Sequence, residues 1–289
     1  MPLVRAEELT YDRIRRLDRH RSIAFLAVSG LEVHGPHLPI VQDVAMAQWM
    51  AEETARRFAE GHPDWTVAVY PPLTVGADEL PLRGSMDVRP SAFHRVLLGH
   101  GASLARAGFG TVVVTNGHGG PRHAAAIEHA CRRTSRRFGI RMVTPSIQVL
   151  HRVITGGRNA RLEELLGRAL ARLAPPKFRP LAALGGLLPP LRETADQLAG
   201  SVGWLLNAHF GYGGAEVSWK GDPSVASAEI GRAFKEILAE DCTAIVTDVV
   251  RGALAPENVR SIASDHAVIQ PGFFARLALA AAVLAALLS

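Results

Sequence analysis

Residues 111–121 read TVVVTNGHGGP and hold the pattern that decides the fold. Thr111–Thr115 is a short apolar run, which is typical of a buried strand. Asn116–Gly120 is a tight turn, and Pro121–Phe138 has helical spacing with proline at its first position, where a helix tolerates it. The stretch therefore predicts a strand that passes through a glycine-rich turn into a helix.

The same alternation continues on both sides of this unit. Further apolar runs predict strands at Ser22–Ser29, Thr66–Tyr70 and Ile140–Thr144. Helical spacing is found at Val44–Phe58, Ser91–Ala107 and Ala226–Val250. Strands separated by helices indicate parallel βαβ units. We therefore expect an α/β fold with three α/β/α layers and a mostly parallel central sheet.

The pattern weakens from about Arg152 to Trp204, where proline pairs at 175–176 and 189–190 interrupt it. We predict one domain over residues 1–252 and a C-terminal extension over residues 253–289. The extension ends in twelve apolar residues, Leu277–Leu288, which is shorter than the roughly 20 residues of a membrane span. We expect Phe273–Leu288 to form a helix covered by its own domain or by a neighbouring subunit, with membrane anchoring as the alternative.

Composition excludes several classes of protein. Hydrophobic residues make up 48% of the 289 residues and charged residues 20%, which is ordinary for a folded domain and excludes a disordered chain. Two cysteines cannot build a disulfide framework, and the charged N-terminus shows no secretory signal, so we expect a cytoplasmic protein. The net charge of +5 comes mostly from scattered arginines without interleaved aromatic residues, so we expect no nucleic-acid partner.

The first candidate site follows the strand at Ser22–Ser29. Glu32, His34, His37 and Asp43 lie within twelve residues, at the carboxyl end of a predicted parallel strand, where α/β sheets place their ligands. A mixture of carboxylate and imidazole ligands suits Zn²⁺, Mn²⁺ or Fe²⁺. The alternative interpretation makes Asp43 a helix N-cap and the histidines ordinary loop residues.

The second candidate site is the turn Asn116–Gly120. His118 lies at the end of another parallel strand, and the glycines around it allow the backbone to approach a ligand closely. A histidine flanked by glycines is by itself more often a turn residue than a ligand. Because both turns lie at the same edge of one sheet, we predict a single site that they share.

These motifs resemble those of the creatininase family of metal-dependent amidohydrolases. The Glu-x-His-Gly-x-His run ending in Asp is present as GLEVHGPHLPIVQD at residues 30–43, and NGHGG follows at residues 116–120. A third motif, GDPSVASAEIG, occupies residues 221–231. The resemblance extends from about Val4 to Gly252 and implies two divalent metal ions.

The resemblance also implies roles for individual residues. Asp43 would bridge the two metals, Glu32 and His118 would hold one of them, and His34 would hold the other. A water molecule between the metals would be the nucleophile, and the metals would polarise the substrate carbonyl. His37 would belong to the surrounding loop, and Asn116 would hold the turn.

One family motif, a His-Ala-Gly-x-x-Glu-Thr-Ser run, has no clean copy in this chain. The best match on chemical identity is HFGYGGAEVS at residues 209–218, which makes His209 and Glu216 the candidate catalytic residues. The alternatives are residues 196–203, in which Leu198 and Gly203 would replace the His and the Glu, and the pair Glu193-Thr194. The long loop Pro71–Pro90 also departs from the family pattern, and we expect its Asp78 and Glu79 to line the substrate pocket.

The resemblance thus implies a metal-dependent hydrolase that cleaves an amide C–N bond in a cyclic or linear small molecule. A second hypothesis is a peptidase that trims the precursor peptide of a redox cofactor, of the mycofactocin type. A third is a degenerate family member that binds metal or ligand without turnover, which the lack of a clean His-Ala-Gly-x-x-Glu-Thr-Ser run suggests. Family members act as oligomers, so we expect a homo-oligomer.

Overall fold

The computed structural model describes residues 3–154 and 227–261 of the 289-residue chain. Several of the predicted features lie outside the described residues: Glu193, His209, Glu216, most of the motif at 221–231 and the apolar tail 273–288. The predictions made for them therefore stay predictions. The described part of the extension includes a 3-10 helix, η5 (Pro256–Asn258), and buried Val259 and Ser261.

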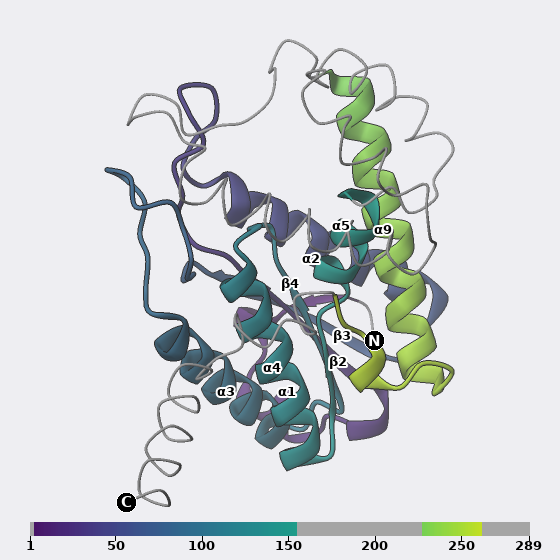
Figure 1. Ribbon diagram of the computed structural model, residues 1–289. Helices are drawn as coiled ribbons and strands as arrows, with labels where there is room; N and C mark the ends of the chain where they lie inside the picture. Colours follow the sequence, from purple (N-terminus) through teal and green to yellow (C-terminus); the bar gives the residue numbers. More distant parts are fainter. Residues whose placement is uncertain (1–2, 155–226, 262–289) are drawn as a thin grey trace, which may run out of the picture.

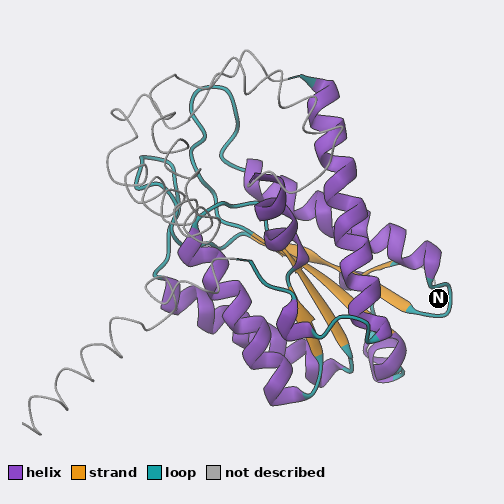
Figure 2. Cartoon of the chain, turned by 45° about the vertical axis from the view of Figure 1, so that its right-hand side comes forward, coloured by secondary structure: helices purple, strands orange, loops and turns teal. Residues whose placement is uncertain are grey.

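A five-stranded parallel sheet forms the middle layer, in the order β1-β3-β2-β4-β5. Its strands are β1 (Val4–Arg5), β2 (Ser22–Val28), β3 (Thr66–Leu73), β4 (Thr111–Thr115) and β5 (Arg141–Val143). Helices cover both of its faces (Figure 2). The predicted three-layer α/β fold is confirmed.

The two faces of the sheet carry different helices (Figure 1). One layer contains α3 (Pro90–Ala107) packed against α4 (Pro121–Phe138). The other contains α2 (Gln42–Gly61), α5 (Pro145–Ile154) and α9 (Ala228–Arg251). A short helix, α1 (Tyr11–Arg15), and two 3-10 helices, η1 (Ala6–Glu8) and η2 (Arg19–Arg21), precede the central strand β2.

Strand β2 shows why these sequences form this sheet. All seven of its residues are buried, because helices cover both faces. Ala24, Leu26 and Val28 pack into the core beneath α3 and α4. Ile23, Phe25 and Ala27 alternate with them and pack into the second core, beneath α2 and α9. A continuous apolar run is therefore required here, as the sequence pattern indicated.

Most predicted elements agree with the structure to within three residues at each end. Strand β4 and helix α4 have the predicted bounds, whereas α2 is longer than predicted, and β3 continues for three residues into the segment predicted as a loop. Strand β3 includes Pro71 and Pro72, so hydrophobic pattern alone placed its end too early.

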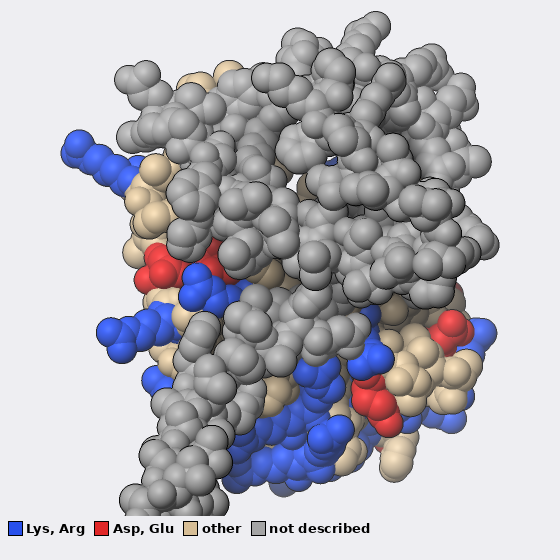
Figure 3. Space-filling model, in the orientation of Figure 1, with Lys and Arg blue, Asp and Glu red and all other residues tan. Residues whose placement is uncertain are grey.

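Arginines gather on the outer face of α4. Arg132, Arg133, Arg136 and Arg137 line a shallow hollow together with His129, and Figure 3 shows Lys and Arg side chains clustered over the region of α3 and α4. Among residues 3–154 and 227–261, no helix is both long and apolar enough to cross a membrane.

Candidate metal centre

The candidate centre lies beyond the carboxyl ends of β2 and β4, which are neighbours in the sheet. After β2 the chain passes through α2 to β3 on one side, and after β4 it passes through α4 to β5 on the other. Two neighbouring strands whose connections leave in opposite directions form a crevice, and ligands of open α/β sheets bind there. Topology therefore brings the two predicted turns together.

The loop after β2 folds back on itself. Glu32 N–H donates to the Ile40 carbonyl at 3.1 Å, and Val33 N–H donates to Ser85 Oγ at 3.1 Å. The first bond closes the nine-residue loop Glu32–Ile40, and the second ties this loop to the segment before α3. Glu32 is consequently buried next to the start of α2, whereas His37 is exposed at the tip of the loop.

Asp43 lies in the first turn of α2 and is buried. The N-cap of this helix is Val41, and it makes no side-chain capping bond. The interpretation of Asp43 as the N-cap is therefore wrong. A carboxylate in the first turn is still favoured by the partial positive charge at a helix N-terminus, but the oxygens of Asp43 face two histidines.

The turn after β4 is held by Asn116, as predicted. Its side-chain amide donates to the His118 carbonyl at 2.6 Å, and its side-chain oxygen accepts from His118 N–H at 3.0 Å. Gly117 allows the turn to approach α2, because a Cβ atom there would lie 2.2 Å from the Asp43 carbonyl oxygen. Packing of backbone on backbone thus brings His118 to Asp43.

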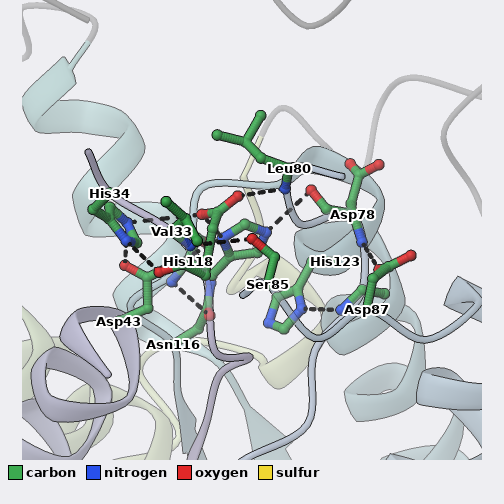
Figure 4. A network of polar contacts seen from close by, with 12 residues as sticks. Val33, His34, Asp43, Asp78, Leu80, Ser85, Asp87, Asn116, His118 and His123 are labelled. Carbon is green, nitrogen blue, oxygen red and sulfur yellow. Dashed lines mark hydrogen bonds and ion pairs between the residues drawn. The ribbon is translucent and has the colours of Figure 1, made fainter. Parts of the chain in front are cut away.

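Four predicted ligands meet at this point, and Figure 4 labels three of them, His34, Asp43 and His118. His34 Nε2 lies 3.1 Å from Asp43 Oδ1 and 3.7 Å from Glu32 Oε2. His118 Nδ1 lies 3.1 Å from Asp43 Oδ2 and 3.1 Å from Glu32 Oε2. Each Asp43 oxygen therefore faces a different imidazole, and Glu32, Asp43 and His118 are all buried.

The electrostatics are those of carboxylates and imidazoles in close contact. Burial works to raise the pKa of Asp43, but hydrogen bonds with His118 and His34 outweigh it and lower that pKa. Burial works to lower the pKa of His118, but its hydrogen bonds to Asp43 and Glu32 raise that pKa to about 10. The hydrogen bond to Asp43 also raises the pKa of His34.

The donor set fits a divalent cation. Glu32, Asp43 and His118 offer ligand atoms that all lie within 4.8 Å of one another. Two buried carboxylates that share one small space need positive charge close by, which either protonation of His118, whose pKa they raise, or a bound divalent cation would supply. Nitrogen and oxygen donors in this ratio suit zinc, manganese or iron.

A second group of potential ligands lies on the other side of His118. It consists of Glu79, His118 and His123, all buried, with ligand atoms within 4.8 Å of one another. His123 Nδ1 accepts a hydrogen bond from Ala77 N–H at 3.1 Å. A neutral imidazole that accepts at Nδ1 carries its proton on Nε2, so His123 has no free Nε2 lone pair for a metal in this arrangement.

The structure places Asp78 and Glu79 against protein groups. The Asp78 carboxylate accepts from the backbone N–H of Arg122 at 3.0 Å and from its Nε at 2.8 Å. Glu79 is buried, and burial together with the nearby Asp87 carboxyl raises its pKa to about 8. Their predicted role as substrate-binding residues stays a prediction.

Sequence reasoning missed the contribution of the first turn of α4. No role was predicted for His123, but its ring makes an edge-to-face contact with His118, with 5.0 Å between ring centroids. Its face stacks on Phe93 at 4.3 Å. The only signal for this in the sequence was its position five residues after His118, which is too weak to identify a partner.

Comparisons with known proteins agree with the geometry. A family model described as creatinine amidohydrolase matches residues 7–169, which is more than half of the chain. This chain belongs to the creatininase family. The match covers every residue of the centre described above, and the resemblance seen in its motifs is thereby confirmed.

A curated relative is the mycofactocin precursor peptide peptidase of Mycolicibacterium smegmatis. It is 30% identical over 122 residues, which cover 41% of this chain and 48% of the peptidase. The matched part of this creatininase-family chain thus spans about half the length of that relative.

Solved structures of creatininases share the fold. A mutant creatininase of Zn–Zn type is 17% identical with a TM-score of 0.53, covering 84% of this chain and 97% of its own. A manganese creatininase is 18% identical with a TM-score of 0.50, covering 87% and 99%. At these identities the likeness concerns the fold alone.

Proposed function

We propose that this creatininase-family hydrolase cleaves an amide C–N bond with the help of divalent metal held by Glu32, His34, Asp43 and His118. The observation that carries the proposal is the meeting of these four side chains in the crevice beyond β2 and β4. A divalent cation bound there would lower the pKa of a water molecule and polarise a substrate carbonyl. The zinc and manganese forms of related creatininases support zinc or manganese as the metal, with iron as a further candidate.

Asp43 has the geometry of a bridging ligand. Its two oxygens face His34 and His118 separately, at 3.1 Å each, so one carboxylate can serve two ions. Glu32 and His118 would complete one position, and His34 the other. This arrangement supports two ions per chain. In the family motif that residues 209–218 resemble, the Glu acts at the second metal, so we propose Glu216 as a further carboxylate for that position.

The relatives support two candidate classes of substrate. The identity to a precursor peptide peptidase favours a peptide substrate over the cyclic amide that the family name suggests. We therefore propose a short peptide as the leading substrate and a small-molecule amide as the second candidate. A cytoplasmic location and a homo-oligomeric state remain our predictions.

Metal content tests the proposed ligands. We expect about two zinc or manganese ions per wild-type chain by elemental analysis. Asp43→Ala removes the shared ligand and should lose both ions, whereas His34→Ala should lose mainly one. Asp64→Ala, which removes an exposed carboxylate paired with Arg21 far from the centre, is the control and should keep both. Full metal content in Asp43→Ala would show that the assignment is wrong.

Activity tests the reaction separately from metal binding. Metal-loaded protein should hydrolyse members of a set of short peptides. Glu216→Gln should abolish most of that activity with little loss of folding stability. Creatinine hydrolysis without peptide hydrolysis would instead favour the second candidate. Full metal content without turnover of either substrate would support a degenerate member. Inactivity of Glu193→Gln with normal activity of Glu216→Gln would transfer the role to Glu193.

A further inference from the structure

The short segment Ala77–Leu80, in the loop between β3 and α3, contacts two of the proposed metal ligands (Figure 4). Leu80 N–H donates to Glu32 Oε1 at 2.6 Å. The Asp78 carbonyl oxygen lies 3.3 Å from His118 Nε2. Glu32 and His118 are 86 residues apart in sequence and come from different strand ends, so this one segment reaches both sides of the centre.

Asp78 holds the segment in an unusual backbone conformation. Its φ angle is 72°, and it is the only residue other than glycine with a positive φ in the described part of the chain. Asp tolerates this left-handed region better than most residues, because its short side chain can hydrogen-bond locally. The conformation turns the Asp78 carbonyl toward His118 while its N–H donates to Asp87 Oδ1 at 2.8 Å.

The first turn of α4 clamps this conformation. Arg122 donates to the Asp78 carboxylate through its backbone N–H at 3.0 Å and through Nε at 2.8 Å. The next residue, His123, accepts from Ala77 N–H through Nδ1. Because α4 starts three residues after His118, the helix that carries these clamps also continues the turn that carries the ligand.

The segment has little room to shift. The Glu79 side chain occupies a narrow slot, where a Cβ atom on either Gly30 or Gly76 would lie 1.8 Å from Glu79 Oε1. Glu79 is itself buried. Movement of the segment would have to withdraw this side chain from the slot, so the clamp and the slot together fix the position of the Asp78 carbonyl.

The contacts with Asp78 and Leu80 determine which nitrogen of His118 and which oxygen of Glu32 face the proposed metal position. A backbone carbonyl only accepts hydrogen bonds, so His118 Nε2 must carry a proton to bond Asp78. His118 Nδ1, which faces Asp43 and Glu32, is then the nitrogen that can release its proton and bind a metal. In the same way, Leu80 engages Glu32 Oε1 and leaves Oε2 toward His118.

We propose that Asp78, clamped by Arg122, is a positioning residue that presents His118 through Nδ1 and Glu32 through Oε2 to the metal. This inference rests on the proposed metal site and adds residues that neither touch the metal nor were predicted to act on it. The Arg122 side chain is 55% exposed but the Asp78 side chain only 8%, so solvent screens this ion pair only in part. Metal affinity, measured on the folded protein, reports its effect on the site separately from its effect on folding stability.

The test is the zinc dissociation constant of the full chain, measured by competition with a chelator. Asp78→Gly keeps the left-handed conformation accessible and removes the clamp, and we expect zinc binding about 10–100-fold weaker. Asp78→Asn tolerates the same φ but has only one acceptor oxygen, so it can keep one of the two hydrogen bonds from Arg122 and should recover part of the affinity. Arg122→Ala, which loses only the side-chain half of the clamp, should weaken binding in the same direction by a smaller factor. Asp64→Gly, which breaks an exposed ion pair with Arg21, is the matched control and should leave the constant unchanged.

A second readout identifies the nitrogen that binds. In cadmium-113-loaded protein with nitrogen-15-labelled histidine, His118 should show coupling to cadmium at Nδ1 and a proton at Nε2. Coupling at Nε2, or zinc binding by both Asp78→Gly and Arg122→Ala within about twofold of wild type, would overturn the inference while leaving the metal site in place. Absence of zinc binding by the wild-type chain would overturn the proposed function and this inference together.

Discussion

His34 and His118 approach Asp43 through different ring nitrogens, and the backbone decides which. His34 Nδ1 lies 2.9 Å from the Glu32 carbonyl, so it carries the proton and leaves Nε2 toward Asp43. His118 has the reverse arrangement, with Nε2 toward the Asp78 carbonyl. Carbonyl partners of this kind orient the rings of metal-binding histidines and set their tautomers.

The ionisation of Glu79 should affect stability at neutral pH. Burial, then the Asp87 carboxyl, raises the pKa of Glu79 from an ordinary 4.5 to about 8. The folded state therefore keeps a proton that the unfolded state has lost, and wild-type stability should fall as pH rises from about 4.5 to 8. The side chain at position 79 in Glu79→Gln is uncharged at every pH, so this variant should not show that decrease in stability.

Denaturant unfolding of the chelator-treated protein between pH 5 and pH 9 measures the difference. The free energy of unfolding of Glu79→Gln should rise relative to wild type as pH increases, with most of the change between pH 5 and 8. The control Glu8→Gln removes an exposed carboxylate and should follow the wild-type profile. Parallel profiles for Glu79→Gln and wild type would show that the Glu79 pKa is not raised.

At the scale of elements, α3 and α4 meet at a glycine. A Cβ atom on Gly101 would lie 2.8 Å from Met142 Sδ and 2.8 Å from Thr134 Cγ2. Thr134 and Met142 are both buried, and the β-branched threonine has little freedom to move away. The close approach of the two helices thus depends on Gly101.

Two glycine substitutions in the same helix should have opposite effects on stability. Gly101→Ala should lower the free energy of unfolding by about 1–3 kcal/mol, because it overpacks a filled site. Gly99→Ala, at an exposed position with nothing within 4 Å of the added Cβ, should raise it by up to ~1 kcal/mol through helix propensity. Thermal and urea unfolding measure both variants. Equal effects of the two substitutions would contradict the packing described for Gly101.

At the scale of the whole molecule, metal binding and folding should be coupled. The ligands come from residues 32–43 and residue 118, which only the folded sheet brings together, so metal binds the folded state in preference to the unfolded one. The two carboxylates would then gain a counter-charge stronger than the proton on His118. We therefore expect the free energy of unfolding to increase with the concentration of free metal.

The expected increase is about 2.7 kcal/mol when free zinc is 100 times its dissociation constant. Thermal unfolding with increasing zinc measures it, and a chelator should reverse it. Asp43→Ala should show no such increase, whereas Asp64→Ala should behave as wild type. A zinc-dependent rise in the melting temperature of Asp43→Ala as large as that of wild type would place the stabilising ion elsewhere in the molecule.

Much of the fold and the position of the candidate centre could be predicted from the sequence. Buried parallel strands require continuous apolar runs, such as those at β2 and β4, and helical periodicity marks the segments between them. Parallel strands end at the same sheet edge, so residues just after two such strands, Glu32 and His118 among them, could be expected to meet. The candidate ligands could be predicted because each group, residues 32–43 and residues 116–120, lies within a short stretch of sequence whose residue types and spacing are visible.

Tertiary structure alone decided how the centre is held. The carbonyl of Asp78 meets His118 across 40 residues of sequence, Leu80 meets Glu32 across 48, and His123 meets Ala77 across 46. No periodicity or motif encodes these pairs, because each depends on the loop before α3 packing against the first turn of α4. The ring nitrogens presented to Asp43, and the burial of Glu79 between Gly30 and Gly76, follow from that packing.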